Sequence, residues 1–204
     1  MLLKSRVFIA SLLLMMVACS SSPPVRYYSL NPIDTDYQQD GDDAVLLGLG
    51  PLRMPDYLNR SQLVTRDAGT EMQIDDYSRW SEPLTLAILR ILSADVDNLL
   101  DDVVVVMFPY DSLIRDQISY RLIGDVNRFD ADQSGKVVLE AQWSIVTTDE
   151  KAVVPVRRIR YTAQATATDS GSVTDPSIVV AAMNDALSQF GRDIASKLKV
   201  ALSN

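Results

Sequence analysis

The first stretch of the chain constrains everything after it. Lys4 and Arg6 give it a basic head, and an apolar run follows from Val7 to Ala18. A basic head, a short apolar run and small residues at the cut are typical of a secretory signal peptide. The apolar run is also too short to cross a bilayer, which takes about 20 residues. We therefore expect residues 1–18 to be a signal peptide and the remainder to be exported.

The only cysteine of the chain, Cys19, stands where cleavage is expected. Met16-Val17-Ala18-Cys19 resembles a bacterial lipobox, in which the cysteine takes a diacylglycerol and becomes the mature N-terminus. The alternative is an ordinary signal peptide with a chance cysteine. Ser20 replaces the aspartate that commonly retains Gram-negative lipoproteins at the inner membrane, which favours the outer membrane. Two or three acyl chains would anchor the protein stably in a membrane, because each buried methylene adds about 0.8 kcal/mol to the free energy of membrane binding.

A short tether then precedes the folded part. Residues 19–26 comprise the lipidated cysteine and a polar, proline-containing linker, which reaches at most roughly 25 Å at about 3.5 Å per residue. The domain must therefore lie close to its membrane. Residues 27–204 contain enough apolar sequence for one domain with a hydrophobic core.

Charge and missing residue types exclude several classes of function. Removal of Lys4 and Arg6 takes the formal net charge from -8 to -10, which argues against a nucleic-acid partner and against binding to anionic head groups. The chain has no histidine, so it lacks the usual general base and the commonest zinc ligand. No phosphate-binding glycine motif is present. We expect no enzyme activity, no cofactor and no metal.

The first half of the mature chain alternates short strands with turns. Strands are expected at Tyr27–Leu30, Ala44–Leu49, Gln62–Arg66 and, briefly, Met72–Ile74. Residues 32–43 are polar and rich in turn formers, so they are expected to be a loop.

The first long helix is expected to open at Ser81-Glu82-Pro83 and to end near Leu100. Ser81 is a suitable cap, Glu82 suits the positive end of the helix dipole, and proline is tolerated in a first turn. One apolar face follows at spacings of three and four: Leu84, Ala87, Ile88, Ile91, Leu92, Val96 and Leu99.

The continuous β-branched run Val103–Met107 predicts a strand buried on both faces. Three alternating stretches follow, at residues 116–128, 137–145 and 158–165, and short polar loops join them. This pattern is typical of an antiparallel sheet with one wet face.

A final helix is expected from Asp175-Pro176, with Asp175 or Thr174 as the cap and proline in the first position. Its apolar face comprises Val179, Met183, Ala186, Leu187, Phe190, Ile194 and Leu198. We predict an α+β single domain, in which a mixed, mostly antiparallel sheet of roughly six to eight strands is packed by two long amphipathic helices.

The run from Gly48 to Arg66, GLGPLRMPDYLNRSQLVTR, resembles a characteristic stretch of the ABC-type transport auxiliary lipoproteins, the family of the paraquat-inducible protein C lipoprotein. Residues 79–84, RWSEPL, are similar to a second segment of that family, and Tyr27–Leu30 resembles its opening aromatic strand. The match is specific between residues 44 and 84 and is weaker afterwards.

This resemblance implies an accessory subunit of an ABC-type or MCE-type system that transports lipids across the envelope. The protein would dock the periplasm-spanning MCE-type component at the outer membrane, and the ATPase would lie elsewhere. Whether the protein forms a homo-oligomer is left open by the sequence. The alternatives are a periplasmic lipid carrier with an internal cavity, and a regulator or pilot lipoprotein of another outer-membrane machine. A hydrolase based on carboxylates is disfavoured by the missing histidine.

Five residues in the family-like segments are candidates for a partner interface. Tyr57, Arg60 and Arg66 either contact a partner or fix a turn against the sheet. Trp80, beside Arg79, is either a hot spot for a partner or part of the core at the helix entry.

Other polar clusters have simpler interpretations. Asp130 to Gly135 resembles half of a calcium loop, but position 12 is Ala141, so a hairpin turn is expected. The acid pairs Asp42-Asp43, Asp75-Asp76 and Asp101-Asp102 are expected to be solvated loop charges. The row with Arg158 and Arg160 is either a basic docking face or simply solvated.

Overall fold

The computed structural model describes residues 22–33, 44–67, 69–169 and 171–203. The predicted signal peptide, Cys19 and the acid pair Asp42-Asp43 lie outside these residues. No helix among the described residues combines the length and the apolar character that a membrane span requires.

The centre of the fold is the 13-residue strand β6 (Tyr120–Asp132). On one side it pairs antiparallel with β7 (Lys136–Thr147), and β7 pairs antiparallel with β8 (Ala152–Gln164). On its other side, the first half of β6 pairs parallel with β2 (Val45–Arg53) and its end pairs parallel with β3 (Gln62–Arg66). One strand therefore joins three partners.

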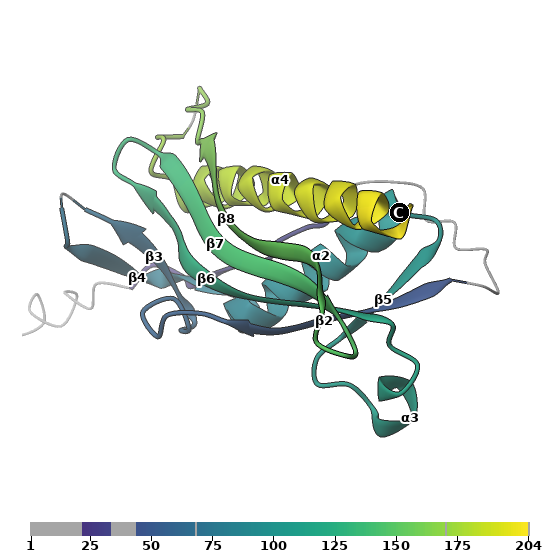
Figure 1. Ribbon diagram of the computed structural model, residues 1–204. Helices are drawn as coiled ribbons and strands as arrows, with labels where there is room; N and C mark the ends of the chain where they lie inside the picture. Colours follow the sequence, from purple (N-terminus) through teal and green to yellow (C-terminus); the bar gives the residue numbers. More distant parts are fainter. Residues whose placement is uncertain (1–21, 34–43, 68, 170, 204) are drawn as a thin grey trace, which may run out of the picture.

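Two short arms complete the eight-stranded sheet. β5 (Val103–Met107) pairs parallel with β2. At the other end, β4 (Met72–Trp80) pairs antiparallel with β3, and β1 (Arg26–Tyr28) pairs parallel with β4. The mixed sheet and the single α+β domain are confirmed, and the longest pairings are the antiparallel ones of β6, β7 and β8 (Figure 1).

The two long helices contact each other on the same side of the sheet (Figure 1). α2 spans Leu84–Leu99 and α4 spans Pro176–Leu202. The Asp175 side chain accepts a hydrogen bond from the Ser177 backbone N–H at 2.9 Å, so the predicted cap is confirmed. Neither of these long helices covers the opposite face of the sheet, and the described residues contain no other long helix. A third, four-residue helix, α3 (Ser112–Arg115), projects from the body.

The core lies between the sheet and the two helices. On β7 the Trp143 ring packs against Phe190 of α4, with ring centroids 5.9 Å apart. Gly124 of β6 is the cross-strand neighbour of Trp143, and a Cβ there would approach the Trp143 Cβ to 3.0 Å. Glycine thus makes room for the largest side chain of the core. All seven predicted core residues of α4 are buried.

Several predicted boundaries were wrong for tertiary reasons. β4 is nine residues long, so Asp75-Asp76 lie on a strand rather than in a loop, because pairing with β3 and β1 extends it. β2 continues through Gly50-Pro51 to Arg53. Asp101-Asp102 does lie in an exposed turn.

The start of α2 also differs from the prediction. Pro83 is the N-cap and makes no side-chain capping bond. The Ser81 backbone N–H instead donates to the Tyr28 carbonyl at 2.9 Å, which joins it to β1. Glu82, just before α2, forms an ion pair with Arg90 within α2.

Two predicted burial patterns were wrong. At the end of α2, Leu99 is exposed. β5 is an edge strand with β2 as its neighbour, so Val104 and Val106 are half-buried and Met107 is exposed rather than buried on both faces. A continuous apolar run cannot distinguish a central strand from an edge strand that a helix covers on one side.

Candidate docking surface

Two of the five candidate interface residues meet at one buried carboxylate. Asp130 of β6 is 0% exposed. Arg66 donates to it through Nη2 at 3.0 Å and Nε at 3.3 Å, and the Tyr57 hydroxyl donates at 3.2 Å. Arg128 Nε donates to the other oxygen at 2.9 Å. The loop before β3, the end of β3 and β6 are thereby fastened together.

This cluster is a fixed arrangement of paired charges. Burial is the main cause that raises the pKa of Tyr57 to about 12, and the charge and hydrogen bond of Asp130 add to it. The hydrogen bond to Asp130 raises the pKa of Arg66. Both groups therefore keep their protons at neutral pH, and the cluster favours the interpretation that Tyr57 and Arg66 fix the turn against the sheet.

The other three candidates lie apart from Asp130. Trp80 is 5% exposed and belongs to the core, which favours its role at the helix entry. Half-buried Arg79 donates to the Asp76 carbonyl at 3.3 Å. Arg60 is half-buried, and its Nε has no hydrogen-bond partner among the described residues. An interface role for these residues stays a prediction.

The glycines at the start of the family-like run support a different part of the surface. A Cβ at Gly48 would come within 2.8 Å of the Tyr110 ring. Gly50 has φ +108° and accepts a hydrogen bond from the Tyr110 hydroxyl at 2.6 Å. Tyr110 also packs edge-on against Phe108, with centroids 5.5 Å apart, and burial raises its pKa to about 12. These contacts fix the base of the loop that carries α3.

We call residues 107–117 the α3 projection (Figure 1). Its internal structure is well specified: Asp111 caps α3 by accepting from the Leu113 N–H at 2.9 Å, and Gln117 Nε2 donates to the Leu113 carbonyl at 2.9 Å. Yet Leu113 is 80% exposed at its tip. Three more large apolar side chains of the projection are also exposed: Met107, Phe108 and Ile114.

One hollow adjoins this projection, and a second hollow lies next to the first. The first has a volume of about 660 Å³ and is lined in part by Phe108, Tyr110, Arg115 and Arg121. The second, of about 350 Å³, lies on the sheet face opposite the long helices. Because Pro51 lines both, they are adjacent, and we call them together the outer groove.

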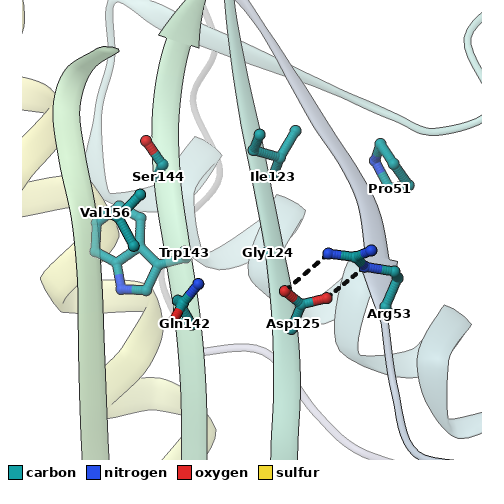
Figure 2. A pocket seen from close by; sticks show the side chains of 9 residues that line it. All are labelled: Pro51, Arg53, Ile123, Gly124, Asp125, Gln142, Trp143, Ser144 and Val156. Carbon is teal, nitrogen blue, oxygen red and sulfur yellow. Dashed lines mark hydrogen bonds and ion pairs between the residues drawn. The ribbon is translucent and has the colours of Figure 1, made fainter.

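Figure 2 shows the second hollow from close by. The Arg53–Asp125 ion pair borders it on one side and Val156 of β8 lies on the other, with Ile123 and Ser144 between them. Ile123 and Val156 are exposed. The sequence gives only a weak signal for this surface, because its apolar residues come from four separate strands and a loop.

The groove is more basic than the chain as a whole. Arg53, Arg115 and Arg121 line it, against two carboxylates, Asp116 and Asp125. The nearest carboxylate to Arg121 is that of Glu150 at 4.0 Å, and the Arg121 Nε is buried without a hydrogen-bond partner among the described residues. Arg158 and Arg160, outside the groove, are hydrogen-bonded to Gln142 and Glu140.

The polar cluster after Asp130 forms the turn between β6 and β7. The predicted hairpin at Asp130–Gly135 is confirmed, and Asp132 accepts from the Ser134 and Lys136 N–H groups within the turn. Gly135 has φ +75°, as such a turn requires. Among the described residues, no group of three or more metal-ligating acidic, cysteine or histidine side chains comes together.

Solved structures show the same fold at low sequence identity. Protein XCC0632 from Xanthomonas campestris, of the DUF330 family, aligns with a TM-score of 0.66 and 17% identity, covering 87% of this chain and 97% of that one. An uncharacterised protein aligns with a TM-score of 0.69 and 19% identity, covering 86% and 99%. The hypothetical protein CT253 from Chlamydia trachomatis has a TM-score of 0.50 and 7% identity, covering 79% and 99%.

At the level of sequence, no curated protein matches the chain. The family model of the ABC-type transport auxiliary lipoprotein component does match, from residue 28 to residue 195. That range begins at the last residue of β1 and ends within α4, so it includes all of the sheet except the first two residues of β1. The chain therefore belongs to the family of ABC-type transport auxiliary lipoprotein components.

Proposed function

We propose that the protein is a non-catalytic docking subunit of an MCE-type envelope lipid transport system, held at the periplasmic face of the outer membrane by acyl chains on Cys19. Family membership supports an accessory role in transport. The observation that carries the docking role is the α3 projection, a rigid loop that exposes apolar side chains beside a groove. Preorganised apolar side chains without a structural role are typical of binding surfaces.

The position of this surface relative to the tether supports the same role. The hydrogen bonds from Ser177 lower the pKa of Asp175 at the start of α4, and the charge of Arg26, where the tether enters β1, adds a smaller effect, so Arg26 lies near this end of α4. α4 has 27 residues and is therefore about 40 Å long. α3 lies towards the other end of the molecule, away from β4 (Figure 1). With a tether of at most roughly 25 Å, the projection can point into the periplasm.

The lipid-carrier alternative finds less support. Such a carrier needs a cavity between its sheet and its helices, and there the described side chains form a continuous hydrophobic core. The hollow in Figure 2 lies on the sheet face away from the long helices, not between the sheet and the helices. Purification of the intact lipoprotein with stoichiometric bound lipid would nevertheless favour a carrier over a docking subunit.

The test is in-cell cross-linking of the full-length lipoprotein, followed by isolation from outer-membrane fractions and mass spectrometry. Recovery of an MCE-type protein is the expected result. Recovery of other envelope proteins alone would replace the docking role by that of a regulator or pilot. Cross-links between two copies of this chain in the same experiment would reveal a homo-oligomer. As a control, the Cys19→Ser variant is expected to disappear from the membrane fraction. An unchanged distribution of the variant between the membrane and soluble fractions would contradict the lipid anchor on Cys19.

A further inference from the structure

We propose that the outer groove and the α3 projection bind an apolar segment of a protein partner that carries a carboxylate side chain, and that Arg121 and Arg115 receive this carboxylate. The inference rests on the proposed docking function and specifies the chemistry of the partner. Three observations carry it: the exposed apolar tip, the size of the groove, and the charges that line it.

The apolar part of the argument starts from Leu113. An 80% exposed leucine contributes little to folding, because most of its surface stays in water. Its loop is nevertheless fixed by the Asp111 cap, the Gln117 hydrogen bond and the packing of Tyr110 on Gly48. A partner that covers Leu113 therefore gains apolar burial without first having to order the loop.

The groove beside the tip has a suitable size. Its two hollows of about 660 and 350 Å³ are each in the range of about 300 to 1,000 Å³ that is typical of binding pockets. Phe108, Ile123 and Val156 supply exposed apolar walls along it. A short amphipathic helix or extended segment can place several apolar side chains along such a surface.

The charges specify the partner further. Arg121 reaches only a distant, exposed carboxylate, Glu150 at 4.0 Å. Its Nε is already removed from water and has no hydrogen-bond partner among the described residues. A carboxylate that docks there would gain a charge-assisted hydrogen bond from an arginine that is already partly desolvated. Arg115 lines the same hollow.

A lipid surface fits the projection less well than a protein segment. Segments that lie in a membrane interface usually carry lysine and arginine on their polar side. α3 is instead flanked by two exposed aspartates, Asp111 and Asp116, and the mature chain is acidic. Anionic head groups would repel this tip, whereas a protein segment can avoid both carboxylates.

The experiment places a photo-cross-linking amino acid at Leu113 of the full-length lipoprotein in cells, with position 86 on α2 as a matched exposed control. Mass spectrometry then identifies the cross-linked peptide. The expected result is one protein adduct from position 113, absent from position 86, whose peptide is apolar and contains Asp or Glu. Adducts with lipid only, with a second copy of this chain only, or no adduct would overturn the proposal.

Charge variants make the test specific. Arg121→Glu is expected to lower the yield of the adduct by about tenfold or more, because it opposes the partner's carboxylate. Arg121→Gln should lower it less. Arg160→Glu, the same charge change on the same strand face, is the control and should leave the yield unchanged, because Arg160 pairs with Glu140 and neither residue lines the groove. Circular dichroism of each purified variant checks the fold, and an equal yield from Arg121→Glu and Arg160→Glu would refute the role of Arg121.

The outcomes separate this inference from the proposed function. If an MCE-type protein co-purifies but position 113 gives no adduct, the groove inference fails and the docking function stands. If position 113 captures an acidic and apolar segment of a protein outside any transport system, and Arg121→Glu abolishes it, the groove inference stands and the proposed function fails.

Discussion

Asp130 and Asp95 are both 0% exposed, but their surroundings differ. Asp130 accepts hydrogen bonds from two arginines and a tyrosine. Asp95, between α2 and α4, accepts one from the Ile33 N–H at 2.7 Å, and its Oδ2 has no hydrogen-bond partner among the described residues. Burial raises the pKa of Asp95 to about 6, against the smaller opposing effects of Ile33 and Arg192. The number of donors, more than depth, decides what a buried carboxylate costs.

The two carboxylates also hold different parts of the molecule. Asp130 fastens the loop before β3 to the centre of the sheet. Asp95 holds the segment that follows β1, and two neighbours on α2 assist it. Asn98 Nδ2 donates to the Ile33 carbonyl at 3.3 Å, and Arg90 Nη2 donates to the Leu30 carbonyl at 3.2 Å. Asp95 therefore helps to fasten the segment after β1 to α2.

The largest effect is expected from Asp130→Ala. The substitution leaves the charges of Arg66 and Arg128 partly buried without their partner, which typically costs about 3–5 kcal/mol. Urea denaturation at pH 7 measures it as a lower midpoint with an unchanged slope. A loss below about 1 kcal/mol would mean that water replaces the carboxylate, and the contrast with Asp95 would disappear.

Asp95→Asn is expected to remove a pH dependence. Because the folded-state pKa of Asp95 is raised from 3.8 to about 6, its stabilising contribution is complete below pH 4 and is lost as the pH rises through 6. The unfolding free energy of the natural protein should therefore fall relative to Asp95→Asn between pH 4 and pH 7, by up to about 3 kcal/mol.

The asparagine keeps an acceptor for the Ile33 N–H, so the variant changes charge more than geometry. Urea denaturation of both proteins at several pH values measures the difference. Asp101→Asn, in an exposed turn, is the matched control and should follow the natural protein. If the unfolding free energies of the natural protein and of Asp95→Asn changed in parallel with pH, burial would not raise the pKa of Asp95.

Tyr57→Phe should have a smaller effect, about 1–2 kcal/mol, because it removes one hydrogen bond to the Asp130 carboxylate while both arginines still satisfy that group. Thermal unfolding measures it. Combining it with Asp130→Ala tests the cluster directly: the double variant should lose less than the sum of the two single losses. Additive losses would contradict a shared network.

The smallest effect is expected from Asp76→Asn, on the exposed face of β4. A solvated carboxylate away from caps and networks should change stability by no more than about 0.5 kcal/mol. The same urea measurement applies. A loss comparable to that of Asp130→Ala would show that exposure is a poor guide to the role of an aspartate in this fold.

Much of the local structure was predictable from the sequence. The Asp175-Pro176 start of α4 and its apolar face are confirmed, as is the hairpin before β7. The predicted alternation of β7 holds only in part, because Val138 and Ser144 are buried on the other face of the strand. These features depend on residues within about four positions of each other. The family resemblance was also visible, because the run from Gly48 to Arg66 is continuous in sequence.

The candidate site was less predictable. The sequence indicated Tyr57 and Arg66 but not Asp130, which lies 73 and 64 residues further along the chain. Asp130 looked like part of a turn. The exposure of Leu113 could not be inferred either, since a short Ser-Leu-Ile run is equally compatible with burial.

By itself the sequence determined the elements with local signals and the lack of histidine, and it predicted an export signal and a single domain. Only the tertiary structure decided that β6 joins three strands, that β5 lies at an edge, and that Asp130 and Asp95 are buried with different numbers of donors. The reason is physical. Caps, turns and amphipathic faces are set by neighbouring residues, whereas strand order and the pairing of buried charges depend on contacts between distant segments that exist only after the core has formed.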